Sequence, residues 1–256
     1  MVQNHLLQLT ALVAMEPPVS FEANAVRNEK LKLIQSLRPI SRDDVKNCFI
    51  RGQYGSGHID GKEVPAYRQE MGVATESMTE TYAAGRFYID NWRWRGVPFY
   101  LRSGKRLARR VSEIAITFKQ VPHSIFYPIS ARDLSPNELV LNVQPEEGMT
   151  LSIQAKQPGP KLCMGTLDLA FKYADIFGGP VPDAYERLLL DCMLGDQTLF
   201  IRNDIIKASW EFFAPVLEAW SEPQSDCPLH TYEAGGQGPE EAATRFYKEG
   251  LRWRNI

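Results

Sequence analysis

The feature that most constrains the fold is a series of short strand-like segments through the middle of the chain. These segments, rich in β-branched and aromatic residues, are 48–54, 79–89, 97–101, 113–119, 138–144, 149–156 and 163–173. Most of them follow one another with no helix of crossover length between them, and parallel strands need such a crossover. We therefore predict a largely antiparallel sheet. Alternating apolar and polar residues, as in 113–119, predict that one of its faces is solvated.

Helical periodicity borders this region on both sides. Apolar residues recur at helical spacing over residues 2–13, and Pro17 ends that helix because proline cannot donate the helical hydrogen bond. A second helix is predicted before Pro39, with Ser20 as its cap. Further helices are predicted at 183–194, at 204–220 and from Pro239 onward. The predicted fold class is α+β, with a large, mainly antiparallel sheet packed against helices.

The helical pattern is already running at Met1, without a capping residue before it. We therefore expect that the chain begins inside a helix of a longer parent and that residues 1–256 form one domain. With 256 residues, 44% of them apolar, it can bury one large core or two smaller ones. Its four cysteines are widely spaced and form no C-x-x-C pair, which argues against a zinc site or a disulfide scaffold and favours a reducing cytoplasm.

Charge is concentrated in one segment. The net charge is −2, yet seven cations and no acid lie between Asp90 and Glu113. Within that run, Gly104 would let the backbone turn and bring Lys105 and a second cation to one anionic group, such as a sugar phosphate. A solvated basic edge explains the run equally well. A nucleic-acid interface is a weaker interpretation, because one basic run in a chain of pI near 6 is a small footprint. No apolar run is long enough to span a bilayer.

His5 is the candidate catalytic residue. On the first helix, a neutral imidazole could accept a proton from an alcohol whose carbon loses hydride. A structural histidine is the alternative, and no carboxylate close in sequence could orient the ring. His58 lies in a glycine-rich segment that lacks the spacing of a phosphate-binding loop, so residues 54–61 are interpreted as a flexible connection.

Several ordered motifs resemble the C-terminal region of glucose-6-phosphate dehydrogenase. They are MVQNHLLQL at residues 1–9, AMEP at 14–17, GQY at 52–54, RGVPFYLRSGK at 95–105, NELV at 137–140 with QP at 144–145, and DAYER at 183–187. This resemblance covers nearly the whole chain. It implies an oxidoreductase that oxidises glucose 6-phosphate to 6-phosphogluconolactone with hydride transfer to NADP, the first step of the oxidative pentose phosphate pathway.

The resemblance also assigns roles to residues. It implies that His5 is the general base, that Lys105 and Arg110 contact glucose 6-phosphate, and that Gln144 is a further substrate contact. It implies association into a homodimer or tetramer through the sheet. No metal, nucleic acid or membrane is expected as a partner. A non-catalytic sugar-phosphate-binding or assembly module is the alternative function.

Parts of the family's catalytic apparatus are missing from this sequence. The glycine-rich nucleotide-binding turn and the RIDHYLGKE peptide, which supplies substrate ligands and the acid that orients the histidine, are absent. We therefore predict that the chain alone has no dehydrogenase activity and that no residue here binds a cofactor. Some family members hold a second, structural NADP in this region. At matching positions the chain keeps Arg102, Asp183 and Trp253 but has Val111, Ala115, Asn142, Ser152 and Gln237 where those members have cations, so we predict no structural NADP.

Overall fold

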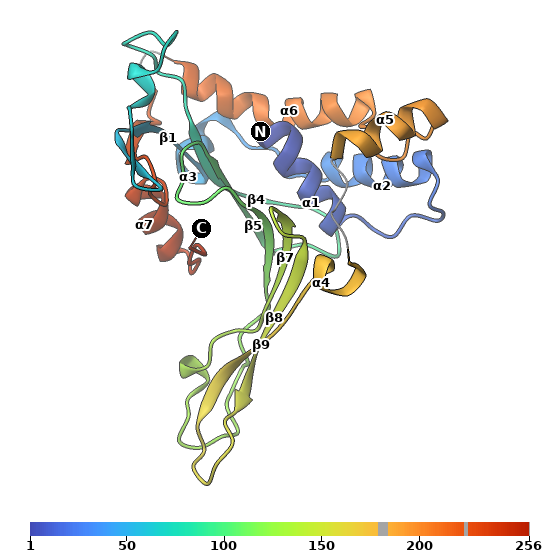
Figure 1. The fold of residues 1–256 in the computed structure, drawn as a ribbon, viewed down its shortest axis with the longest axis vertical. Helices are drawn as coiled ribbons and strands as arrows, with labels where there is room; N and C mark the ends of the chain where they lie inside the picture. The colour runs from blue at the N-terminus through green and yellow to red at the C-terminus, as the bar shows by residue number, and fades with distance from the viewer. Residues whose placement is uncertain (179–183, 223–224, 256) are drawn as a thin grey trace. The chain divides into compact units, whose positions relative to one another are not determined.

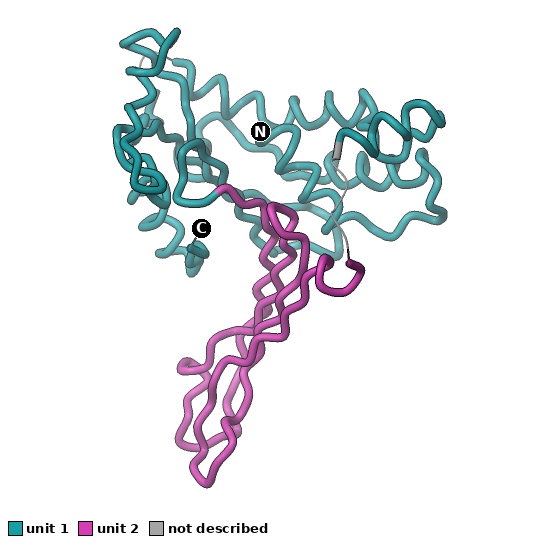
Figure 2. The backbone as a smooth tube through the Cα atoms, viewed as in Figure 1, with its two compact units in different colours: residues 1–109, 184–256 teal, residues 110–183 magenta. Residues whose placement is uncertain are grey.

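The computed structural model describes residues 1–178, 184–222 and 225–255. Two compact units divide the chain: unit 1 comprises residues 1–109 and 184–256, and unit 2 comprises residues 110–183 (Figure 2). Each unit contains one four-stranded sheet, so the predicted strands are divided between two sheets. The predicted fold class, a mainly antiparallel α+β structure with sheet packed against helices, is confirmed (Figure 1).

Unit 1 is built on a sheet with the strand order β10-β1-β4-β5. Its strands are β1 (Phe49–Gly55), β4 (Tyr82–Tyr88), β5 (Pro98–Gly104) and β10 (Leu229–Glu233). β1 runs antiparallel to β4 and β4 antiparallel to β5, whereas β10 pairs with β1 in parallel. The sequence interpretation missed β10, because its partner lies about 180 residues earlier and no local pattern records such a pairing.

Helices cover both faces of this sheet, as the alternation of β1 side chains requires. Phe49 packs in a core with the helices η1 (Val2–Leu6), α1 (Leu7–Ala14), α2 (Ala23–Gln35) and α6 (Asn203–Ser221). Ile50, the next residue, packs in a second core with α7 (Glu240–Lys248). Two further helices complete the described helices of the unit, apart from single 3-10 turns: α3 (Val45–Cys48) and α5 (Ala184–Leu194).

Two local predictions in unit 1 were wrong. Ser20 does not cap α2: the residue before the helix is Glu22, no side chain caps it, and Ser20 stands three residues before the first helical residue. Residues 54–61 are not simply a connection. They include β2 (Gly57–Ile59), which pairs with β3 (Lys62–Val64) across a turn in which Asp60 and Gly61 both have positive φ. Asp-Gly is a sequence signal for that type of hairpin turn.

Unit 2 is an antiparallel meander. β6 (Ser112–Thr117), β7 (Glu138–Gln144), β8 (Gly148–Lys156) and β9 (Met164–Lys172) pair in sequence order, and α4 (Tyr173–Phe177) follows. The connections from β7 to β8 and from β8 to β9 are too short for a crossover, so these strands pair antiparallel. The bounds of β7 coincide with the predicted segment, and those of the other three strands differ from the prediction by one or two residues.

Candidate functional site

His5 lies in the short helix η1, which opens the chain. The backbone of η1 has the wider π spacing, with the amide of Leu6 donating to the carbonyl of Met1 at 3.2 Å, before it continues as the α-helix α1. Val2 and Leu7, on either side of His5, are buried in the core, so the helix is firmly held while the imidazole is only half-buried. π turns are frequent at functional sites. Among the described residues, no side chain or backbone group makes a hydrogen bond to the His5 ring, so the orienting acid is not found there.

Lys105 directly follows the last residue of β5. Gly104 was predicted to provide a tight turn, but it is still paired with Tyr82 in the sheet, and the positive φ, 54°, belongs to Arg106. Glycine is needed at 104 for a different reason: a Cβ there would lie 2.7 Å from the Tyr82 ring and 2.9 Å from Leu107. The backbone therefore turns one residue after Lys105, which leaves the Lys105 side chain exposed at the end of the strand.

Hydrogen bonds to the backbone amides and carbonyls of residues 105–108 hold this turn in place. The Lys105 amide donates to the carbonyl of Thr81 at 2.8 Å, and the Lys105 carbonyl accepts a bond from the Tyr232 hydroxyl at 2.7 Å. The Arg106 carbonyl accepts from the Gly235 amide at 2.7 Å, and the Ala108 amide donates to Gly236 at 2.9 Å. We call residues 105–108 the lysine turn. It is fixed by the residue before β4, by β10 and by the segment after β10. Leu107 packs against the second core, whereas the side chains of Lys105 and Arg106 are exposed.

The cations of the basic run are not equivalent. Arg106 forms an ion pair with Glu70 at 3.2 Å, and Arg93 forms one with Glu16 at 3.0 Å. Hydrogen bonding to Glu70 raises the pKa of Arg106. Lys105 and Arg109 have no acidic partner among the described residues. The run is therefore not a uniform basic patch. Its turn presents the Lys105 ammonium without a competing carboxylate, which fits both a phosphate site and a solvated edge.

Arg110 and Gln144 belong to unit 2. Gln144 is the last residue of β7 and is paired with Ser112, the first residue of β6. Because Arg110 lies two residues before Ser112, it stands at the same end of this strand pair as Gln144, and both side chains are exposed. Each unit thus carries two of the four predicted site residues: His5 and Lys105 in unit 1, Arg110 and Gln144 in unit 2. Convergence of the four on one ligand stays a prediction.

Sequence reasoning missed the residues that hold the lysine turn. Tyr232 comes from β10 and Thr81 from the residue before β4, and neither lies in a motif that predicts a site. His230 also lies in β10, with its Nδ1 3.2 Å from a carboxylate oxygen of Glu241. A prediction of a strand over residues 229–233 would have been needed to place Tyr232 in the sheet core.

Two of the positions matched to the structural NADP of other family members pack on each other. The Arg102 guanidinium lies 5.0 Å from the centroid of the Trp253 ring, and it also donates to the Arg254 carbonyl. The third retained position, Asp183, lies outside the described residues.

No helix in the described part of the chain is long and apolar enough to cross a membrane. Nor does that part gather three or more His, Cys, Asp or Glu side chains that could bind a metal ion.

Comparison with known proteins identifies relatives along the whole chain. Residues 1–254 match the family model described as glucose-6-phosphate dehydrogenase, C-terminal domain. The glucose-6-phosphate 1-dehydrogenase of Aggregatibacter actinomycetemcomitans is 46% identical over 254 residues, which are 99% of this chain and 50% of that protein. The Bacillus subtilis enzyme of the same name is 43% identical over 256 residues, covering 100% of this chain and 52% of that protein. The chain thus spans about half the length of these curated relatives.

Solved structures give the same result. A structure described as glucose-6-phosphate dehydrogenase in complex with its substrate glucose-6-phosphate superposes with a TM-score of 0.85 at 37% identity, over 98% of this chain and 50% of that one. Glucose-6-phosphate 1-dehydrogenase from Mycobacterium avium superposes with a TM-score of 0.80 at 36% identity, over 99% of this chain and 49% of that one. The matches extend through both compact units.

Proposed function

Because the chain belongs to the family of glucose-6-phosphate dehydrogenase C-terminal domains, we propose that it is the substrate-binding and oligomerisation half of a glucose-6-phosphate dehydrogenase. The reaction is the oxidation of glucose 6-phosphate to 6-phosphogluconolactone with hydride transfer to NADP, at the entry to the oxidative pentose phosphate pathway. The observation that carries this proposal is the likeness, over 98% of the chain, to a structure described as the enzyme with glucose 6-phosphate bound.

In this proposal His5 accepts the proton of the sugar C1 hydroxyl as the hydride leaves C1. A half-buried imidazole on an anchored helix suits that role, because the ring stays accessible while its backbone is fixed. A carboxylate from the other half of the enzyme would orient the ring. That requirement agrees with the lack of a hydrogen-bond partner for His5 among the described residues.

Lys105 and Arg110 are the proposed phosphate ligands, and Gln144 a further hydrogen-bonding contact to the substrate. A lysine supplies a compact charge that pairs with a phosphate dianion, and an arginine supplies several N–H donors. Support comes from the unpaired, exposed ammonium of Lys105 on its fixed turn, and from the shared strand end of Arg110 and Gln144.

The residues present do not fit a nicotinamide cofactor. The sequence has no G-x-G-x-x-G turn for the nucleotide. At the positions matched to the structural NADP of other family members, the Arg102 guanidinium packs on Trp253, and five other positions hold neutral residues in place of cations. We therefore keep the proposals that the hydride acceptor binds to the other half of the enzyme and that this chain binds no dinucleotide. Association through sheet surfaces into a dimer or tetramer, and a cytoplasmic location, are proposed on the basis of family membership.

Calorimetric titration of the chain with glucose 6-phosphate tests the proposed substrate. We expect weak, saturable binding that glucose without phosphate does not reproduce. Lys105→Ala should weaken binding by about 10- to 100-fold, the worth of one charge-assisted contact, and leave residual binding through the other ligands. Arg109→Ala, which removes an exposed cation of the same run that is not a proposed ligand, should leave the affinity within about twofold, since an exposed charge without a direct contact contributes little. Equal losses in both variants, or equal binding of glucose, would refute the assignment.

A non-catalytic sugar-phosphate-binding or assembly module remains the second candidate, favoured by the fact that the chain covers only about half of its relatives' length. Both candidates predict binding in the titration. They differ when the chain is mixed with the separately produced nucleotide-binding half of a relative. Recovery of NADPH formation supports the enzyme, whereas binding without recovery supports the module.

A further inference from the structure

The Tyr232 hydroxyl belongs to a chain of hydrogen bonds that ends at Lys105. The Tyr54 amide donates to Thr81 Oγ1 at 3.0 Å, and Thr81 Oγ1 lies 3.1 Å from the Tyr232 hydroxyl oxygen. The Tyr232 hydroxyl in turn lies 2.7 Å from the Lys105 carbonyl, which can only accept. Each hydroxyl has one proton, so one direction satisfies all three contacts: Tyr54 donates to Thr81, Thr81 to Tyr232, and Tyr232 to Lys105.

The Tyr232 ring is fixed independently of its hydroxyl. Its side chain is almost fully buried, with the ring centroid 5.5 Å from that of Tyr82 and 6.4 Å from that of Tyr54. Burial raises the pKa of Tyr232 to about 12, so the hydroxyl keeps its proton and remains a donor under physiological conditions. The donor is thus part of the core of unit 1, while the acceptor belongs to an exposed turn.

We propose that Tyr232 is a positioning residue for Lys105: its buried hydroxyl fixes the Lys105 carbonyl and thereby directs the ammonium group toward the sugar phosphate. This inference rests on the proposed function. A lysine side chain has four rotatable bonds, and it loses more entropy on binding if its own backbone is also free. Together, the Thr81 carbonyl and the Tyr232 hydroxyl hold the amide and the carbonyl of Lys105, so only the side chain remains to be ordered.

The test compares two matched substitutions in the same aromatic cluster. Tyr232→Phe keeps the ring and removes the hydroxyl that bonds Lys105. Tyr82→Phe removes a hydroxyl from the neighbouring ring, which is equally buried but makes no hydrogen bond to the lysine turn among the described residues. We expect Tyr232→Phe to weaken the binding of glucose 6-phosphate by about 5- to 10-fold, the worth of one hydrogen bond, and Tyr82→Phe to change it less than twofold.

A double-mutant cycle separates positioning from general stability. If Tyr232 acts through Lys105, Tyr232→Phe should cause no further loss of inorganic phosphate binding once Lys105 is replaced by glutamine. An equal loss in both backgrounds would overturn the positioning role while leaving the phosphate site intact. No loss on replacing Lys105 itself would instead refute the proposed function, so the two failures are distinguishable.

A second variant covers the case in which Tyr232→Phe does not fold. Thr81→Val removes the hydroxyl that donates to Tyr232 without touching the tyrosine, and Thr81→Ser restores it. We expect a smaller loss of glucose 6-phosphate affinity for Thr81→Val and recovery in Thr81→Ser. Faster hydrogen exchange at the amides of residues 105 and 106 should accompany the loss. Unchanged exchange and affinity in Thr81→Val would contradict the proposal.

Discussion

At the scale of single residues, burial of tyrosine hydroxyls connects the core to the candidate site. Tyr82 and Tyr232 lie in one cluster beside the lysine turn, and burial raises the pKa of each to about 12. Gly104 is constrained by the same cluster, because any side chain there would collide with the Tyr82 ring. The residue that carries the charge is therefore exposed, and the residues that hold it are buried.

The raised pKa of Tyr82 predicts a loss of stability in alkali. An unfolded tyrosine ionises near pH 10, whereas the folded one ionises near pH 12, so between these values the folded state binds more protons. The free energy of unfolding should therefore fall as pH rises through this window, by up to about 2 kcal/mol for Tyr82. Urea unfolding of the chain and of Tyr82→Phe at pH 9 and pH 11.5 measures it. A variant with the same loss as the parent chain would exclude this tyrosine as the cause.

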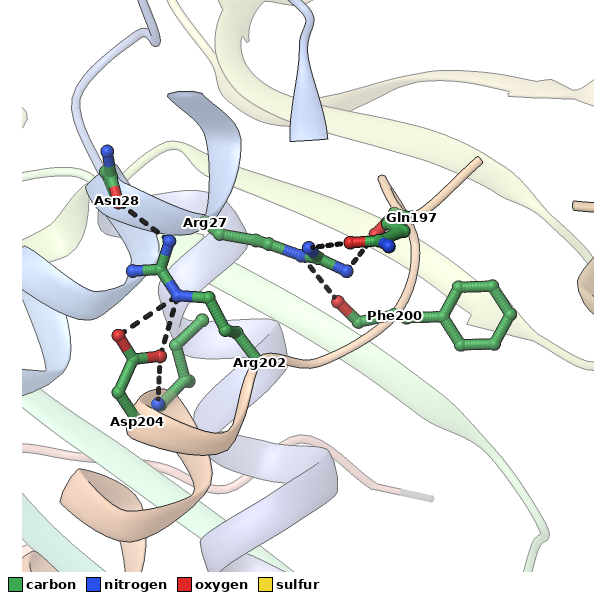
Figure 3. A network of polar contacts seen from close by, with 7 residues as sticks. Arg27, Asn28, Gln197, Phe200, Arg202 and Asp204 are labelled. Atoms are coloured by element: carbon green, nitrogen blue, oxygen red, sulfur yellow. Dashed lines mark hydrogen bonds and ion pairs between the residues drawn. The ribbon is translucent and has the colours of Figure 1, made fainter. Parts of the chain in front are cut away.

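At the scale of elements, a buried arginine joins α2 to the segment before α6. Arg27 donates to the side chain of Gln197 at 2.9 Å, to the Gln197 carbonyl, and to the Phe200 carbonyl at 3.0 Å (Figure 3). Beside it, Arg202 contacts Asp204 at 2.8 Å and Asn28 at 2.9 Å. Arg27 thus supplies the donor for the Phe200 carbonyl, whereas the Gln197 carbonyl also accepts from the Phe200 amide at 3.1 Å.

We predict that Arg27→Leu destabilises the chain by about 2 to 3 kcal/mol, because it leaves the Phe200 carbonyl without its donor and removes two further hydrogen bonds to Gln197. Arg202→Leu is the control, since it removes a more exposed guanidinium and should cost less than about 1 kcal/mol. Urea unfolding monitored by circular dichroism gives both values. A larger loss of stability for Arg202→Leu than for Arg27→Leu would show that burial of an arginine does not determine how much its hydrogen bonds stabilise this connection.

The strands with strong local patterns were predictable from the sequence, and the long-range features were not. Segment 138–144 was found at its observed bounds because its apolar and β-branched residues form one continuous local run. β10 was missed because its parallel pairing with β1 is set by packing across the unit. The candidate Lys105 came from a motif, whereas its support by Tyr232 depends on a contact between residues 127 positions apart, which no spacing rule encodes.

At the scale of the whole molecule, the proposed function divides the active site between this chain and the other half of the enzyme, so the chain alone is predicted to be inactive. The proposed general base, His5, is present, but the nucleotide-binding turn and the acid that would orient its ring are not found in the sequence. Purified chain should therefore form no NADPH from saturating glucose 6-phosphate and NADP above the rate of a His5→Ala variant. NADPH formation that depends on His5 would show that the 256 residues hold a complete site.

On the proposed function, His5 and Lys105 bind one and the same glucose 6-phosphate. An NMR titration that follows the His5 imidazole and the Lys105 ammonium together, with glucose as the control ligand, can decide this. We predict that both signals shift along a single binding curve with glucose 6-phosphate and that neither shifts with glucose. A Lys105 signal that saturates while the His5 signal stays unchanged would contradict the claim.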